Sequence, residues 1–105
     1  MSLFFFENAT SDLQSIELSK IQAHLLYEHT KDMMLEIDAD TGLMWQMNYE
    51  TSDYLSFDGA DNLTPKQYRI AFDTVVKACE TVPELRDVYE PIKTSLMLDP
   101  RFQAA

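Results

Sequence analysis

Hydrophobic and polar positions near the N-terminus follow the period of an α-helix. Ser11, with Gln14 three residues later, has the pattern of a capping box, and we expect a helix from there to about residue 30. Its apolar positions form two stripes on roughly opposite faces. A helix that is apolar on two sides is either enclosed in its own domain or shared with a partner chain, so the pattern favours a homodimer. The stripe expected at the shared face consists of Leu18, Ile21 and Leu25.

The pattern changes to a period of two in the next segment. Met33, Leu35 and Ile37 alternate with the residues between them, which is typical of a strand; the alternative is a helix that continues through Ile37. The sequence DADTG at residues 38–42 is typical of a type I turn closed by a left-handed glycine. The alternation resumes after this turn, so the segment predicts a β-hairpin.

One face of this hairpin is expected to pack against the helices. We assign Leu43, Trp45 and Met47 to that packed face, because they occupy every second position and include the single tryptophan. A third short strand is predicted at Tyr54–Phe57. The apolar run at Leu3–Phe6 predicts either a further strand or a buried N-terminal plug.

The clearest helix start in the chain lies at Thr64. Thr64 is the expected N-cap, Pro65 takes the first helical position, and Gln67 completes a capping box. After Pro83 the sequence predicts two helical pieces joined at Pro91. The expected buried stripe of the helix that starts at Thr64 consists of Tyr68, Ala71, Phe72, Val75, Ala78, Cys79 and Val82.

Together these elements predict an α+β fold that forms a single domain over residues 1–105. A small antiparallel meander of three to four strands, at about residues 33–57, would pack against an N-terminal helix and two to three C-terminal helices. An antiparallel sheet needs only one covered face. Its other face would then be free to bind a partner.

Length and composition place the chain among proteins that bury their own core. A chain of 105 residues with 46% hydrophobic residues can fold without metals or disulfides. The single cysteine, Cys79, cannot form an internal disulfide, which fits a reducing compartment. No apolar run resembles a signal-peptide core or approaches the ~20 residues of a membrane span. We therefore expect a cytoplasmic protein.

The net charge of −10 is concentrated in one third of the chain. Residues 32–64 carry eight acidic residues and no Lys, Arg or His, whereas residues 65–105 carry six acidic and six basic residues. Nucleic acids and anionic membranes are themselves negatively charged, so neither is expected as a direct partner. The distribution favours a basic protein surface instead.

No set of residues in the sequence indicates catalysis. His24 and His29 are five residues apart, so they do not share a helix face as a metal-binding pair would. Cys79 is expected on an apolar helix face, where a free cysteine behaves as a small hydrophobic residue. Two glycines cannot supply a glycine-rich phosphate loop. We expect no catalytic residue and no cofactor.

The acidic turns do not match a metal-binding loop. Asp38 and Asp40 resemble the start of a calcium loop, but Gly42 comes one residue early and the position of the last ligand holds Tyr49. Aspartates in such turns commonly bond their own backbone. We therefore expect no metal site.

These features favour a small acidic protein-binding module, such as an adaptor, an inhibitor or a chaperone-like protein, rather than an enzyme. It would present the negatively charged hairpin of residues 32–64 to a basic protein, with adaptable methionine among the carboxylates. The alternatives are a nucleic-acid mimic that blocks a DNA- or RNA-binding protein, and an enzyme subunit with an acidic divalent-metal site. The residues expected to bind the partner are Glu36, Asp38, Asp40, Glu50, Asp53, Asp58, Asp61 and Met44.

Overall fold

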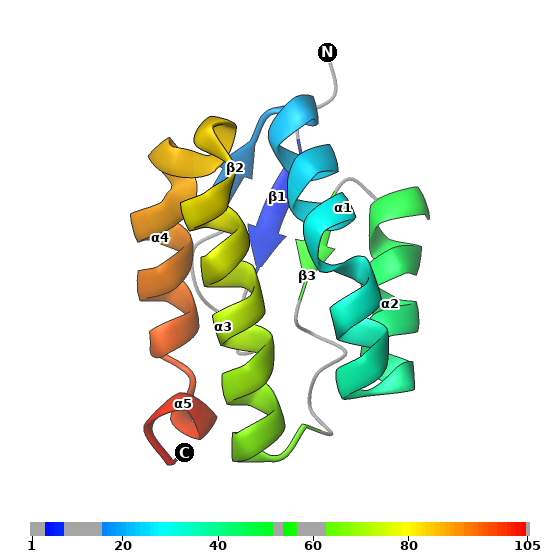
Figure 1. Ribbon diagram of the computed structural model, residues 1–105, viewed down its shortest axis with the longest axis vertical. Coiled ribbons are helices and arrows are strands. Elements are labelled where there is room, and N and C mark those ends of the chain that lie inside the picture. Colours follow the sequence, from blue (N-terminus) through cyan, green and yellow to red (C-terminus); the bar gives the residue numbers. More distant parts are fainter. Residues whose placement is uncertain (1–3, 8–15, 52–53, 57–62, 105) are drawn as a thin grey trace.

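The computed structural model describes residues 4–7, 16–51, 54–56 and 63–104 of a mostly helical protein. Helices α1 and α2 lie side by side on one flank, α3 runs through the middle, and α4 lies on the other flank (Figure 1). In chain order the elements are β1 (Phe4–Glu7), β2 (Ile16–Leu18), α1 (Lys20–Ile37), α2 (Ala39–Thr51), β3 (Tyr54–Ser56), α3 (Pro65–Thr81), the 3₁₀ turn η2 (Pro83–Leu85), α4 (Arg86–Met97) and α5 (Pro100–Ala104).

Helix α1 begins with a capping box one turn before its first buried residues. The Ser19 hydroxyl accepts a hydrogen bond from the Gln22 backbone N–H at 3.2 Å, and the Ser19 N–H donates to the Gln22 side chain at 2.9 Å. The expected cap at Ser11 and Gln14 lies outside the described residues, and the helix itself starts later than predicted. It also ends later, because it continues past residue 30 to Ile37.

The predicted antiparallel meander at residues 33–57 is wrong. Residues 33–37 complete α1, and residues 39–51 form a second helix that packs against α1 as a helical hairpin (Figure 1). Buried positions explain this outcome, because Thr41, Trp45 and Asn48 follow one another at spacings of four and three. Among the described residues of the predicted meander, only Tyr54–Ser56 is a strand. The alternation in the sequence was therefore compatible with a helix, and the α+β meander gives way to a mostly helical fold.

The predicted packed face of the hairpin is wrong for the same reason. Positions separated by two lie about 200° apart around a helix, so Leu43, Trp45 and Met47 cannot all face the core. Trp45 is fully buried, whereas Leu43 and Met47 are exposed.

Asp38 makes the link between α1 and α2. Its extended backbone ends α1, and its carboxylate accepts hydrogen bonds from the Thr41 N–H at 3.0 Å and the Thr41 hydroxyl at 2.8 Å. These bonds satisfy donors in the first turn of α2. The DADTG sequence is thus a helix–helix junction and not the turn of a β-hairpin.

Gly42 allows the two helices to approach closely. A Cβ atom at this position would lie 2.6 Å from the Leu35 Cα, a distance that real Cβ contacts essentially never show. The missing side chain therefore brings the backbone of α2 against that of α1.

A small mixed sheet lies behind the helices in Figure 1. Its order is β2-β1-β3, with β1 antiparallel to β2 and parallel to β3. Of the two alternatives for the apolar run near the N-terminus, a strand or a buried plug, Phe4–Glu7 forms a strand, and this strand occupies the centre of the sheet. Helix α1 contacts all three strands, so the sheet closes one side of the core.

The structure confirms the helix that was predicted to start at Thr64, as α3. The Thr64 hydroxyl accepts from the Gln67 N–H at 3.1 Å, the Thr64 N–H donates to the Gln67 side chain at 2.9 Å, and Pro65 takes the first helical position. The predicted stripe is buried at every position: Tyr68, Ala71, Phe72, Val75, Ala78, Cys79 and Val82.

The C-terminal segment forms a longer helix than predicted. Pro91 does not divide it into two pieces, because α4 runs through Pro91 from Arg86 to Met97. Helix α5 then starts at Pro100, where Asp99 accepts hydrogen bonds from the Arg101 backbone and side chain. Burial alone would raise the pKa of Asp99, but these bonds and the charge of Arg101 outweigh it and hold the pKa below its usual value.

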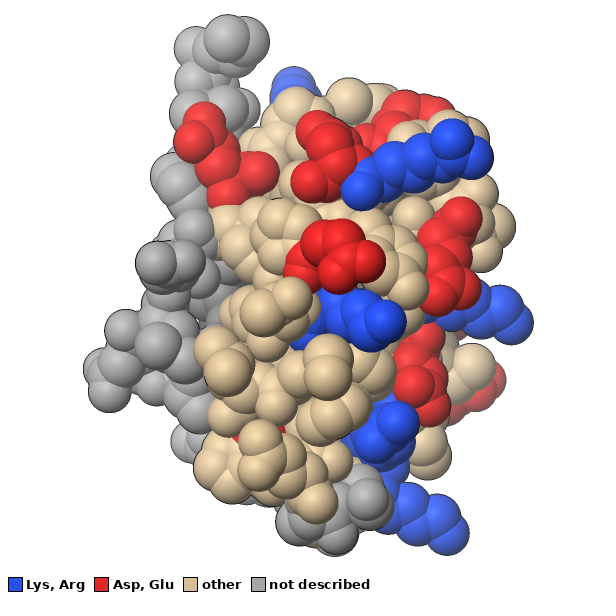
Figure 2. Space-filling model, turned by 90° about the vertical axis from the view of Figure 1, so that its left-hand side faces the viewer, with Lys and Arg blue, Asp and Glu red and all other residues tan. Residues whose placement is uncertain are grey.

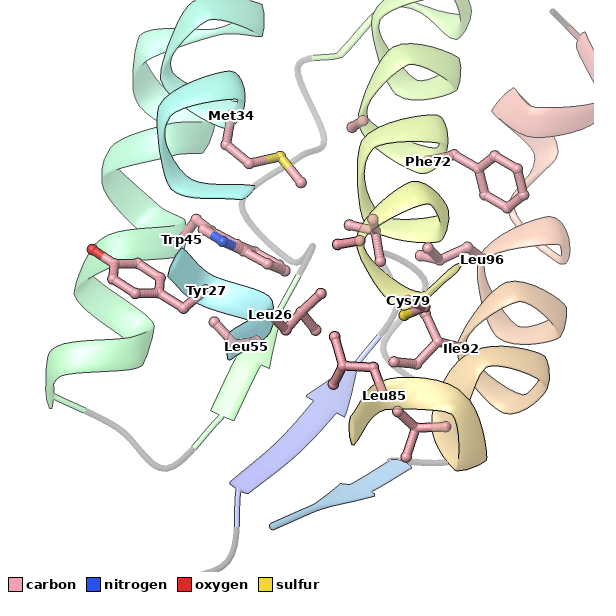
Figure 3. Packing of buried hydrophobic residues seen from close by; sticks show 14 of the residues in the cluster. Leu26, Tyr27, Met34, Trp45, Leu55, Phe72, Cys79, Leu85, Ile92 and Leu96 are labelled. Carbon is pink, nitrogen blue, oxygen red and sulfur yellow. The ribbon is translucent and has the colours of Figure 1, made fainter. Parts of the chain in front are cut away.

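The buried residues form one cluster to which every layer contributes. Figure 3 shows Trp45 reaching from α2 into this core beside Met34 and Leu26 of α1. The Trp45 indole N–H donates to the Thr30 hydroxyl at 3.0 Å, and Thr30 donates in turn to the Leu26 carbonyl at 2.7 Å. Trp45 is therefore both packed and hydrogen-bonded, and it attaches α2 to the rest of the domain.

Candidate interaction surface on the helical hairpin

The structure separates the acidic residues predicted to bind a partner. Glu36, Asp40 and Glu50 are exposed on the hairpin formed by α1 and α2, whereas Asp38 is half-buried because it caps α2. Met44 is exposed on α2. The remaining predicted residues, Asp53, Asp58 and Asp61, lie outside the described residues.

The residues predicted for self-association do not form one stripe. Leu18 belongs to strand β2 and is fully buried in the core. Ile21 is exposed at the start of α1, and Leu25 is partly buried. Since Leu18 precedes the helix, the helical spacing used in the prediction does not apply to it.

The side of α2 that faces away from Trp45 carries three exposed apolar residues. Leu43 is 54%, Met44 37% and Met47 53% exposed. Asp40 and Glu50 lie on the same side of the helix, one turn before and one turn after this group. We call these five residues the α2 outer face. Sequence reasoning missed Leu43 and Met47 because it placed them in a packed strand face; the signal was that α2 is apolar on both sides.

The exposed side of α1 adds a row of carboxylates. Glu28, Asp32 and Glu36 follow at four-residue spacing and are all exposed. Lys31 forms an ion pair with Glu28 at 3.2 Å. The hairpin as a whole, residues 20–51, contains six carboxylates and two lysines.

A groove of about 400 Å³ lies between the two helices on the outside of the hairpin. The rings of Tyr27 and Tyr49 line it, stacked with centroids 4.2 Å apart and planes at 6°. Glu28, Asp32 and Glu50 lie along it together with Lys31. We call this space the hairpin groove.

The charges along the hairpin groove lie close to the tyrosines. Burial and then the charge of Glu50 raise the pKa of Tyr27, and burial and then the charge of Glu28 raise the pKa of Tyr49. The charge of a carboxylate from the opposite helix thus acts on each tyrosine. Because both pKa values are raised from about 10, both phenols are neutral at physiological pH.

The other half of the helical layer has a different surface. Residues 65–104 carry six acidic and six basic residues. On the α4 side of the molecule, Lys and Arg side chains alternate with Asp and Glu side chains (Figure 2). On α3, the Arg69 side chain lies 3.7 Å from the Asp73 carboxylate. Of these two halves of the helical layer, only the hairpin therefore carries a net negative charge.

Two other kinds of site are not supported by the described residues. Cys79 is buried, and burial followed by the charge of Glu80 raises its pKa to about 11, so its thiolate is scarcely populated. Within the part of the chain that the structure describes, no group of three or more His, Cys, Asp or Glu side chains could hold a metal ion.

Comparisons with protein-family models, with curated proteins and with solved structures found no match to this chain. Among the described helices, none is both long enough and apolar enough to cross a membrane.

Proposed function

We propose that this protein is a binding module for a basic, amphipathic segment of another protein, which docks on the α2 outer face. The observation that carries the proposal is the exposure of Leu43, Met44 and Met47 on the most acidic substructure of the described chain. Apolar side chains gathered on a helix face often mark an interaction site.

The apolar part of the surface suits a partner helix or strand of variable shape. Two of its three side chains are methionines, which adapt to different partners because they are unbranched and polarisable. Leu43 and Met47 are separated by one helical turn, so a partner side chain can insert between them.

The charged residues of the surface determine which sign of charge a partner must carry. Asp40 and Glu50 lie on the α2 outer face, and the carboxylate row of α1 lies on the same hairpin. A basic segment is attracted to such a field, whereas an acidic one is repelled. Charge complementarity therefore commits the site to a cationic partner.

A second copy of this chain is a poorer occupant than a basic segment. Each copy carries a net charge of −10, and pairing through α2 would bring Asp40 and Glu50 of both copies close together. Like charges across an interface are unfavourable. The homodimer predicted from the sequence is therefore not part of this proposal.

The proposal can be tested with a fluorescein-labelled amphipathic peptide of leucine and arginine, titrated with the full chain in fluorescence anisotropy. We expect saturable binding that weakens as salt is raised, because part of the attraction is electrostatic. The triple variant Leu43→Gln, Met44→Gln, Met47→Gln should lose affinity by roughly tenfold or more, since its apolar contact area is removed.

A matched control removes three apolar side chains elsewhere. Ile70, Met97 and Leu98 are also exposed but lie in the charge-balanced half of the protein. Their triple glutamine variant should bind the peptide as the unmodified chain does. Equal losses in the two triple variants, or no loss in the α2 variant, would contradict the proposal. If sedimentation gives a dimeric mass, and the α2 variant is monomeric, the occupant of the α2 outer face would be a second copy of the chain and not a basic partner.

A further inference from the structure

The hairpin groove differs in chemistry from the α2 outer face beside it. Its floor is aromatic, and carboxylates from both helices lie along it. We propose that this groove binds the guanidinium group of an arginine side chain. The inference rests on the proposed function in one respect, because the arginine would belong to the basic segment that docks on α2.

Lys31, a cation of the chain itself, already interacts with the groove. The Lys31 ammonium group lies 3.2 Å from a Glu28 carboxylate oxygen and 5.7 Å from the centre of the Tyr27 ring. A carboxylate and an aromatic face thus act on the same cation. The hydrogen bond to Glu28 raises the pKa of Lys31, which keeps it protonated.

The negative charge of the groove is not balanced by this lysine. Glu28 has its partner in Lys31, but among the described residues no cation forms an ion pair with Asp32 or Glu50. Glu50 accepts a long hydrogen bond of 3.4 Å from the neutral Gln46 side chain. A second cation in the groove would therefore meet two carboxylates that have no ion-pair partner among the described residues.

A guanidinium group fits this environment better than an ammonium group. It is planar and weakly hydrated, so it can lie against an aromatic ring and donate to carboxylates from its edge at the same time. An ammonium group is compact and strongly hydrated, and it loses more when it leaves water. The volume of about 400 Å³ suits one side chain with part of its stem.

The ligand can be tested without any partner protein. N-acetyl-arginine amide should shift the backbone amide resonances of Tyr27, Lys31 and Tyr49 in NMR titrations, with half-saturation on the order of a millimolar. N-acetyl-citrulline amide, which has the same shape without the charge, should produce no saturable shift. Shifts elsewhere on the protein, or equal shifts with the citrulline or lysine analogue, would overturn the guanidinium assignment.

Substitutions at the rim provide the matched comparison. The double variant Asp32→Asn, Glu50→Gln should bind the arginine analogue roughly fivefold more weakly, because two carboxylate charges along the groove are removed. The control Asp73→Asn, Glu90→Gln makes the same change in net charge on α3 and α4 and should bind unchanged. Equal weakening in both double variants would show a general charge effect and contradict the site.

Lys31 provides a test in the opposite direction. Lys31→Gln removes the competing ammonium group and frees Glu28, so the arginine analogue should bind roughly fivefold more tightly. The control Lys77→Gln changes the net charge equally on α3 and should have no effect. Weaker binding to Lys31→Gln would count against the assignment.

The two proposals fail separately. The α2 triple variant leaves the groove residues in place, so it should bind the arginine analogue normally while it loses the peptide. If the analogue fails to bind but the peptide still requires the α2 outer face, the groove inference alone is wrong. If the analogue binds but the peptide is indifferent to the triple variant, the docking proposal alone is wrong.

Discussion

The α1–α2 hairpin and the α3–α4 pair contribute to the same core but present opposite kinds of surface. Residues 20–51 carry six carboxylates and two lysines, whereas residues 65–104 carry equal numbers of acidic and basic residues. The hairpin also exposes Leu43, Met44 and Met47 on one helix face. Solubility alone requires no particular place for charge. Charge that is segregated next to exposed apolar side chains instead suits recognition of a basic, amphipathic partner.

The two regions also differ in how each helix uses its apolar residues. Helix α3 has one apolar stripe, from Tyr68 to Val82, and the core buries all of it. Helix α2 is apolar on two sides, and the core takes only the side with Trp45. We therefore expect a few strong contacts to hold α2 against the rest of the protein. Single substitutions at these contacts should lower the free energy of unfolding.

The largest expected effect is at Trp45. Trp45→Ala removes a fully buried ring and its bond to Thr30, so it should lower the free energy of unfolding by roughly 3–5 kcal/mol in urea denaturation followed by circular dichroism. Phe72→Ala in α3 is the matched comparison and should cost a similar amount. A loss at Trp45 below about 1 kcal/mol would show that α2 is attached in another way.

A smaller effect is expected at Gly42. Alanine is the better helix former by about 1 kcal/mol, but its Cβ would lie 2.6 Å from the Leu35 Cα. The cost of pushing α1 and α2 apart should exceed the gain in helix propensity. Gly42→Ala should therefore destabilise the protein by about 1–2 kcal/mol in the same assay. Met44→Ala, at an exposed α2 position, should stay within about 0.5 kcal/mol. A more stable Gly42→Ala variant would show that the close approach is not needed.

The smallest expected loss of stability is at the residues that cap α2 and α3. Asp38→Ala should cost about 0.5–2 kcal/mol, because the first turn of α2 loses the acceptor for Thr41. Thr64→Ala at the start of α3 should cost a similar amount. Asp38→Asn keeps an acceptor and should restore most of the stability. If Asn fails to restore it, the charge of Asp38 and not its hydrogen bonds would be what matters.

The sequence predicted the second half of the fold better than the first. For α3, the cap at Thr64, the proline at the first position and one apolar stripe all indicate the same helix, and the structure confirms it. For residues 33–47, apolar residues occupy so many positions that periods of two and of 3.6 both fit. The Asp38 pattern was equally ambiguous, because aspartate caps helices as readily as it starts turns.

The candidate site was predictable only in part. The concentration of carboxylates in residues 32–64 was visible in the sequence, and Glu36, Asp40, Glu50 and Met44 are exposed. The role of Asp38 as a cap was not foreseen. The hairpin groove was not foreseen either, because Tyr27 and Tyr49 meet only after α1 and α2 pack antiparallel.

By itself, the sequence determined where the charge is placed, where α3 begins and which of its residues are buried. These properties depend on residue type and on neighbours within one helical turn. Only the tertiary structure decided that residues 39–51 form a helix, and which of its two apolar sides faces water. That choice depends on long-range packing: the buried Trp45 donates its indole N–H to Thr30 of α1, and Gly42 permits the required approach of the two helices.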